Sequence, residues 1–406
     1  MAHALYFSEA QYSAISRLRY GLGILIGLFF LLWVFEKITK GEIRYAEVAF
    51  SSAHIFLIIY GLVFSYYFGG IHLFANKNFL FFIISIIFGF VLVNCFYPPR
   101  KGYVAPNILI AIYVLSTLYL IMTDAISFSP LPTLNLEPLS IVEGRARRYN
   151  ATVSSYFAIG AFLFFLKSHQ YQAYRSTLPW IVGSIFFTYL SMLGGSRGNF
   201  VIGLFTIVTI AIRTRSSKHI LLYTLGFLLV VYYLIHSGTL YDLVLVNRMN
   251  AITGYVEIYD ENGQLIDQAL NFGRRDLLIL QGIELLTDEP FCLIAGCGFN
   301  FFQIYNDYVF ALYPHNSVIE LGISFGLIIS ALLVFAAVIG SIRLYLSEQG
   351  KNAIFYICAY FLLVSLKSGS LVNVTTLPMM LIFAFHAHEK FTFTGKTYRL
   401  FGNRVK

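Results

Sequence analysis

The chain has 406 residues, of which 58% are hydrophobic and only 12% charged, and its formal net charge is +8. Soluble domains are about one quarter charged, so this composition excludes an ordinary soluble globular protein. The basic residues are scattered over the connecting segments rather than gathered in one stripe, so we expect no nucleic-acid partner.

Apolar runs long enough to cross a bilayer recur along the chain. There is room for about eleven or twelve of them, each a helix whose backbone polar groups are bonded internally. The sequence therefore predicts an all-α polytopic membrane protein, with residues 1–406 forming a single integral membrane domain. The predicted spans are 20–36, 49–68, 79–97, 105–123, 151–166, 178–195, 198–212, 219–236, 317–340, 353–371 and 375–388.

Two of the connections between spans are long, namely 124–150 and 237–316. If the segment 237–316 faces outward, the inner segments carry more Lys and Arg than the outer ones, as insertion into a bilayer favours. We therefore predict that both long loops lie on the outer face. The basic C-terminal tail would then lie inside, where it can contact anionic membrane lipids.

The first outer loop, 124–150, reads DAISFSPLPTLNLEPLSIVEGRARRYN. Its prolines and polar residues are typical of irregular chain. It ends in a cluster of Arg145, Arg147 and Arg148.

The main outer loop, 237–316, is the longest segment without a predicted span, and long ordered loops are usually functional. Within it, RRDLLILQGIELL has the apolar spacing of an amphipathic helix at the membrane surface. Arg274 and Arg275 begin that helix. Their guanidinium groups can bind phosphate in a bidentate manner, which makes them a candidate anion site; contact with lipid headgroups is the structural alternative.

Three further polar residues stand at the ends of predicted spans. Arg197, in LGGSRGNF, lies between two spans, where an arginine either faces a cavity or partner or extends to the headgroups. His315, in YPHNS, is a candidate general base because an imidazole ordinarily titrates near neutrality; a hydrogen bond to a nearby carbonyl is its structural alternative. Asn316 could orient that imidazole or cap the next helix.

Two cysteines, Cys292 and Cys297, lie in the main loop beside Gly296 and Gly298, which allow a tight turn. An oxidising compartment would permit a disulfide between them, and their spacing is not a zinc pattern. No HExxH-like histidine pair, P-loop, GxGxxG, GxSxG or DxD motif occurs in the chain. We therefore expect no metal and no cofactor.

Four of these segments occur in a fixed order: SRGNF, GRRDLLI, GCGFNFF and PHNSVIELGISFG. Together they resemble the O-antigen polymerase and O-antigen ligase superfamily of bacterial envelope glycosyltransferases, over roughly residues 185 to 335. The HN step followed by ELGxxxG is the most specific part of the resemblance. The family often has a tryptophan after the loop arginine, where this chain has Leu278.

The resemblance implies a GT-C-like fold in the bacterial inner membrane, with a multi-pass chain whose active site faces the periplasm. It implies transfer of a glycan from an undecaprenyl-diphosphate-linked oligosaccharide, and catalytic roles for His315, Arg197 and Arg274. The residues expected to bind substrate are Arg275, which is also the alternative to Arg274, Asn316, Arg145, Arg147 and Arg148. A chain-length regulator protein is a further candidate partner.

Three functions remain open on the sequence. The first is an O-antigen polymerase that transfers the glycan to another lipid-linked repeat unit by metal-independent, inverting displacement. The second is a ligase that transfers it to lipid A–core. The third is a flippase of lipid-linked sugars, which would place charged residues along a central cavity, whereas the predicted spans contain almost none. We favour the polymerase, because a second diphosphate lipid could bind the RARR cluster.

Overall fold

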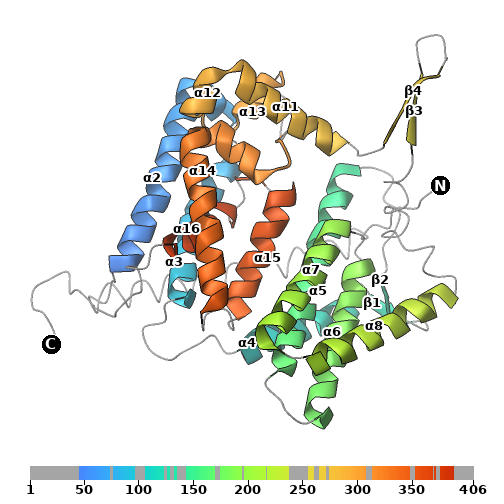
Figure 1. Cartoon of the computed structure of the whole chain (residues 1–406). Coiled ribbons are helices and arrows are strands. Elements are labelled where there is room, and N and C mark those ends of the chain that lie inside the picture. Colours follow the sequence, from blue (N-terminus) through green and yellow to red (C-terminus); the bar gives the residue numbers. More distant parts are fainter. Residues whose placement is uncertain are drawn as a thin grey trace, which may run out of the picture. The chain divides into compact units, whose positions relative to one another are not determined.

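The computed structural model describes residues 45–73, 76–96, 106–122, 126–128, 132–134, 143–169, 174–193, 196–215, 217–236, 255–259, 265–270, 274–307, 313–347, 353–368, 370–371 and 375–387. The predicted span 20–36 lies outside these ranges. The described residues pack as two compact units, which we treat separately and show in Figure 1.

The first unit, called here the α5 unit, contains the middle of the chain. Its elements are α4 (Pro106–Met122), β1 (Ile126–Phe128), β2 (Pro132–Leu134), α5 (Glu143–Ser168), α6 (Tyr174–Leu193), α7 (Arg197–Thr214), α8 (Ser217–His236), β3 (Tyr255–Tyr259) and β4 (Leu265–Leu270).

The second unit, called here the α14 unit, joins an early segment to the C-terminal part of the chain. Its elements are α2 (Tyr45–Tyr67), η1 (Gly70–Leu73), α3 (Asn76–Phe96), α11 (Arg274–Asp288), α12 (Pro290–Ile294), α13 (Phe301–Tyr305), α14 (Ser317–Leu346), α15 (Ala353–Ser368) and α16 (Thr376–Phe385).

Among the residues that the structure describes, five helical segments are long and apolar enough to cross a membrane, judged by length and composition. They are Val48–Tyr67, Ser176–Leu193, Arg197–Thr214, Ser217–His236 and Ser317–Leu346. These segments make the chain a candidate multi-pass membrane protein. Every predicted span in the described ranges coincides with a helix, so the helices themselves are confirmed. Membrane crossing by the remaining helices stays a prediction.

The two long loops contain more regular structure than the sequence indicated. In the first, β1 pairs antiparallel with β2, and α5 begins at Glu143 rather than near residue 151. In the second, β3 pairs antiparallel with β4 before α11 begins. The expectation of an all-α chain therefore missed two short strand pairs.

Helices of the α5 unit approach closely because small residues line their contacts. A Cβ atom at Gly160 on α5 would lie 2.9 Å from the ring of Phe187 on α6, and one at Gly203 on α7 would lie 2.9 Å from Cβ of Ala158. The hydroxyl of Ser184 donates to the carbonyl of Ala161 at 2.8 Å. Small residues and interhelical hydroxyl bonds are the usual means of helix association in membranes.

The α14 unit is arranged around its longest helix. Helix α14 has 30 residues and is broken at Gly326; the part after the break, residues 327–346, is about 30 Å long, enough to cross the hydrocarbon core. It packs against α16 so closely that a Cβ atom at Gly340 would meet the backbone of Phe383. Helices α11, α12 and α13 form a cap at one end of α14 and α2 (Figure 1).

Candidate functional site

The predicted site residues fall in both units. Arg274, Arg275, His315 and Asn316 belong to the α14 unit, whereas Arg197 and the three arginines of the RARR cluster belong to the α5 unit. Because the two units are treated separately, the description below begins with the α14 unit, around the start of α14.

A segment of the main outer loop is inserted against a break in α14. Gly326 has φ 78° and ψ 162°, which no residue within a helix adopts. The break leaves carbonyl oxygens of the preceding turn without helical partners. Two of these accept hydrogen bonds from the loop: Cys297 N–H donates to Ile323 O at 2.7 Å, and Gly298 N–H donates to Ser324 O at 3.2 Å.

The same segment contacts α2 on its other side. Ser65 donates from Oγ to the carbonyl of Phe299 at 3.0 Å, and the Tyr60 hydroxyl donates to the carbonyl of Ala295 at 2.5 Å. Gly298 has φ 79°, and a Cβ atom there would lie 2.5 Å from the carbonyl oxygen of Gly61. The loop thus sits between α2 and α14 with its backbone groups bonded, as irregular chain near membrane depth requires.

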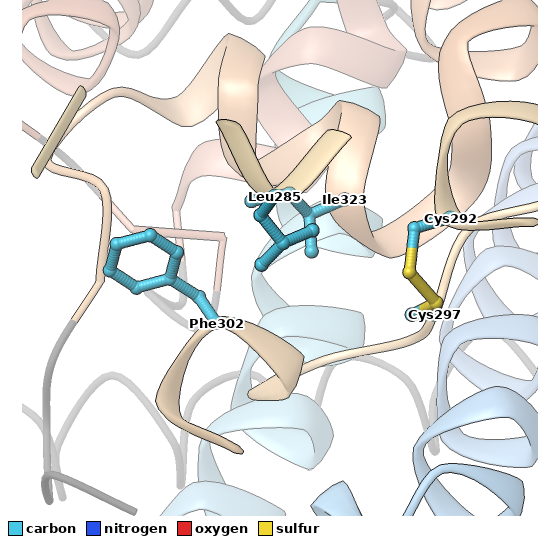
Figure 2. Close-up of a cluster of buried hydrophobic side chains, with 5 residues drawn as sticks. All are labelled: Leu285, Cys292, Cys297, Phe302 and Ile323. Atoms are coloured by element: carbon cyan, nitrogen blue, oxygen red, sulfur yellow. A yellow bond between two sulfur atoms is a disulfide. The ribbon is translucent and has the colours of Figure 1, made fainter. Parts of the chain in front are cut away.

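A disulfide between Cys292 and Cys297 closes the turn that leads into this segment. Both cysteines belong to a buried cluster with Leu285, Phe302 and Ile323, and Figure 2 shows these five side chains. The cluster joins α11, α12 and α13 to α14. The cap is therefore a small core of its own rather than a loose loop.

Helix α11 confirms the predicted amphipathic helix, which begins at Arg274. A Cβ atom at Gly282 would lie 2.7 Å from Cγ2 of Ile319 and 3.1 Å from Cβ of Pro314. Further along, Leu286 approaches Gly322. Helix α11 therefore runs alongside the first turns of α14, with Gly282 beside Pro314 and Leu286 beside Gly322. Arg274 begins α11 about 12 Å of helix before Gly282.

His315 lies directly between Pro314 and the start of α14, in the left-handed conformation with φ 53°. Such a conformation costs a residue other than glycine about 1–3 kcal/mol and persists only where the surroundings impose it, most often at functional sites. The imidazole is half-buried, and its centroid lies 4.0 Å from that of Tyr313.

Asn316 caps α14. Its Oδ1 accepts hydrogen bonds from the backbone N–H groups of Val318 at 2.9 Å and Ile319 at 3.3 Å. Of the two roles that the sequence left open, capping the helix is therefore the one that the structure shows.

Glu320, which the sequence reasoning did not single out, is a buried carboxyl side chain in the first turn of α14. Its Oε1 accepts from the Ser370 hydroxyl and its Oε2 from the Leu371 N–H, both at 2.8 Å. The acidic residue of the ELG step was the signal for it, because an ionisable side chain in an apolar span is costly and is usually functional.

A hydrogen bond between the end of α13 and the end of α11 also holds the cap together. The Tyr305 hydroxyl at the end of α13 donates to Oδ2 of Asp288 at the end of α11, at 2.6 Å. This hydrogen bond to the carboxylate raises the pKa of Tyr305 to about 12 because ionisation would remove the donated proton.

In the α5 unit, Arg197 is the first residue of α7 and is half-buried. The neighbouring Asn199 is buried and donates from Nδ2 to Ser155 Oγ on α5 at 2.8 Å. Ser154 and Ser191 each donate to the other's carbonyl at 2.8 Å. The SRGNF segment therefore starts α7 on a well-anchored joint between α5 and α6.

Arg145, Arg147 and Arg148 lie in the first turns of α5 instead of in irregular chain. Within the described ranges, no three His, Cys, Asp or Glu side chains gather as a group that could hold a metal ion. No model of a known protein family matches the sequence, and no curated protein matches it. The proposals below depend on the residues and their geometry.

Proposed function

We propose that this protein is a membrane glycosyltransferase that polymerises undecaprenyl-diphosphate-linked O-antigen repeat units at the periplasmic face of the inner membrane. The observation that carries the proposal is the placement of His315. It is a strained histidine at the start of a long apolar helix, and it adjoins a surface helix that begins with two arginines.

In the proposed reaction, a sugar hydroxyl of the acceptor attacks the anomeric carbon of the donor glycan. The new glycosidic bond forms as the bond to the diphosphate oxygen breaks, and the anomeric configuration inverts. His315 takes the proton of the attacking hydroxyl. General-base assistance of this kind is worth about 10²–10⁴-fold in rate.

The leaving diphosphate gains negative charge as the bond breaks. Arg274, with Arg275 beside it, opens a helix that packs against Pro314, so its position suits a clamp on a donor held near His315. Fixed guanidinium groups in a partly dry site stabilise such charge without reorganising during the reaction. Arg197 lies in the other unit, and its catalytic role stays a prediction from the sequence.

The side of the membrane is supported by the disulfide. Cys292 and Cys297 are paired in the loop that forms the cap. Structural disulfides persist in the periplasm and other oxidising compartments and are rare in the cytosol. The pairing therefore favours an outward-facing cap, in agreement with the distribution of Lys and Arg.

The RARR cluster favours the polymerase over the ligase. Arg145, Arg147 and Arg148 lie in the first turns of α5, where the helix dipole disfavours positive charge. Arg145 and Arg148 are spaced to share one face of the helix. A second lipid diphosphate would offset the unfavourable charge, and only a polymerase uses a diphosphate-linked acceptor.

The test is a lipopolysaccharide gel from a strain that lacks the gene, complemented with the wild-type chain or with variants. Loss of the ladder with core bearing one repeat unit supports a polymerase. Bare core with polymer accumulating on undecaprenyl diphosphate indicates the ligase. An unchanged ladder contradicts both.

His315→Ala should fail to restore the ladder while reaching the membrane in normal amount. The matched control is His72→Ala, because His72 is an exposed histidine of η1 in the same unit. Ladders of normal length from the His315→Ala strain would refute the catalytic role of His315.

A further inference from the structure

A chain of buried and partly buried polar contacts joins the start of α14 to the end of α15 and the start of α16. Ser317 Oγ donates to the carbonyl of Ser365 at 2.8 Å, and the hydroxyl of Ser365 lies 3.0 Å from that of Thr376. Thr376 in turn donates to the carbonyl of Ser370 at 3.2 Å. Glu320 completes the chain, because the Ser370 hydroxyl donates to its carboxylate.

We propose that Glu320 is a positioning residue, which holds His315 in its left-handed conformation by fastening the first turns of α14 to residues 370–371. The inference deepens the proposed function, since it concerns the same site. Its structural readout is the accessibility of His315, which can be measured whether or not the protein is a polymerase.

The link from Glu320 to the histidine is short. The backbone N–H of Glu320 donates to the carbonyl of Asn316 at 3.1 Å, and Asn316 is the residue directly after His315. Ser317, one residue further, is fastened to α15 by its own hydroxyl. A shift of the first turn of α14 would therefore move the backbone of His315 with it.

On its other side, His315 is fixed through Pro314. This buried proline packs on α11 at Gly282, where a Cβ atom added to the glycine would lie 3.1 Å from Cβ of Pro314. The φ angle of proline is also restricted by its ring. His315 thus lies between two fixed points, which are Pro314 packed on α11 and the first turn of α14. Among the described residues that fasten this first turn, Glu320 has the only ionisable side chain.

The contacts of Glu320 indicate a fastening role rather than a reacting one. Both carboxylate oxygens are occupied by neutral donors, Ser370 and Leu371, each at 2.8 Å. The side chain itself is only 8% exposed. A carboxyl group occupied on both oxygens in this way is well suited to holding backbone in place, because each donor beside it has a hydrogen-bond partner.

Substitution by glutamine separates the two roles. In Glu320→Gln the amide oxygen can still accept from Leu371 N–H, while the amide nitrogen can donate to Ser370 Oγ, since a hydroxyl rotates to accept. The fastening is kept and the charge is lost. In Glu320→Ala both bonds are lost, including the one to the buried N–H of Leu371.

The experiment measures the carbethoxylation rate of His315 by diethyl pyrocarbonate, followed by peptide mass spectrometry on the purified full-length protein in detergent. His72 is the internal reference in every sample. Glu320→Ala should raise the His315 rate relative to His72 by about threefold or more and lower polymer synthesis by about tenfold or more, as expected for the loss of two hydrogen bonds. Glu320→Gln should stay within about twofold of wild type in both.

Should Glu320→Ala fail to reach the membrane, Ser370→Ala removes a single bond to the same carboxylate and should raise the His315 rate in the same direction. Equal losses of synthesis in Glu320→Gln and Glu320→Ala would overturn the proposal, because the carboxylate itself would then be required. An unchanged His315 rate in both Glu320→Ala and Ser370→Ala would overturn it as well. Normal synthesis by His315→Ala would instead refute the proposed function and leave the carbethoxylation result standing.

Discussion

Ser65 on α2 donates a hydrogen bond from its hydroxyl to the main-chain oxygen of Phe299, across 234 positions of sequence. The same hydroxyl lies 2.6 Å from the carbonyl oxygen of Gly61 on its own helix. This contact fixes the inserted segment of the main outer loop to α2, while Cys297 and Gly298 fix it to α14. The whole cap depends on that segment staying in place.

Gly298→Ala should therefore destabilise the α14 unit strongly. A left-handed alanine costs about 1–2 kcal/mol, and its Cβ atom would clash with the backbone of Gly61 and Ser65, which adds about 1–3 kcal/mol. Thermal unfolding in detergent measures the effect. Gly322→Ala is the control, because the nearest atom, Leu286 Cδ1, lies 3.4 Å away in ordinary contact. Equal unfolding temperatures for the two variants would contradict the placement of this loop segment between α2 and α14.

The disulfide makes a separate prediction. Without reductant, the denatured protein should expose only two of its four cysteines to alkylation, and peptide mapping should find Cys292 joined to Cys297. Replacing both by serine should lower stability by about 2 kcal/mol, as the chain-entropy estimate for so short a loop gives. Cys358→Ala, at the free buried cysteine of α15, controls for cavity effects. Alkylation of all four without reductant would contradict the pairing.

The two arginines that open α11 can be distinguished by exchange for lysine. If Arg274 grips the diphosphate, Arg274→Lys should lower polymer synthesis by about 10²–10³-fold, because lysine keeps the charge and loses the bidentate fork. Arg275→Lys should lower polymer synthesis by a smaller factor. Glu284→Gln, an exposed position on the same helix, should be neutral. A larger loss in Arg275→Lys would transfer the role to Arg275.

Stability at acid pH should depend on His169, just after α5. Burial and the nearby His219 lower the pKa of His169 to about 4, and its Nε2 lies 3.3 Å from Thr214 Oγ1. The unfolded chain takes up the proton near the ordinary value of about 6.5, so folding stability is complete above that pH and falls as the pH drops toward 4.

His169→Gln should consequently lose less stability than wild type between pH 7 and pH 5, as unfolding temperatures would show. His72→Gln, at an exposed position, should follow the wild-type curve. Parallel curves for wild type and His169→Gln would contradict the lowered pKa of His169.

Much of the local structure could be predicted from the sequence, because it depends on neighbours along the chain. Apolar runs predicted the helices, and the leucine spacing after Arg274 predicted α11. The insertion could not be predicted in this way. It pairs residues 295–299 with α2 and with a break at Gly326, and nothing distinguishes that glycine from others in apolar helices.

The candidate site also has parts that the sequence could predict and parts that depend on tertiary contacts. His315 was singled out by its residue type and its place before a span, whereas its left-handed backbone follows from tertiary anchors on both sides. Glu320 was absorbed into an apolar run because its partners, Ser370 and Leu371, are some fifty positions away. The strands β1 and β2 have only three residues each, too few to show alternation.

The segment inserted between α2 and α14 also implies an order in which its contacts form during synthesis. Cys292 and Cys297 are five positions apart, so both are available for pairing as soon as that short stretch has been made. Ser65 is made long before them, whereas Ile323 and Ser324 are made after them. The hydrogen bonds from Cys297 and Gly298 to α14 therefore form last, and a chain that stops before residue 317 lacks them.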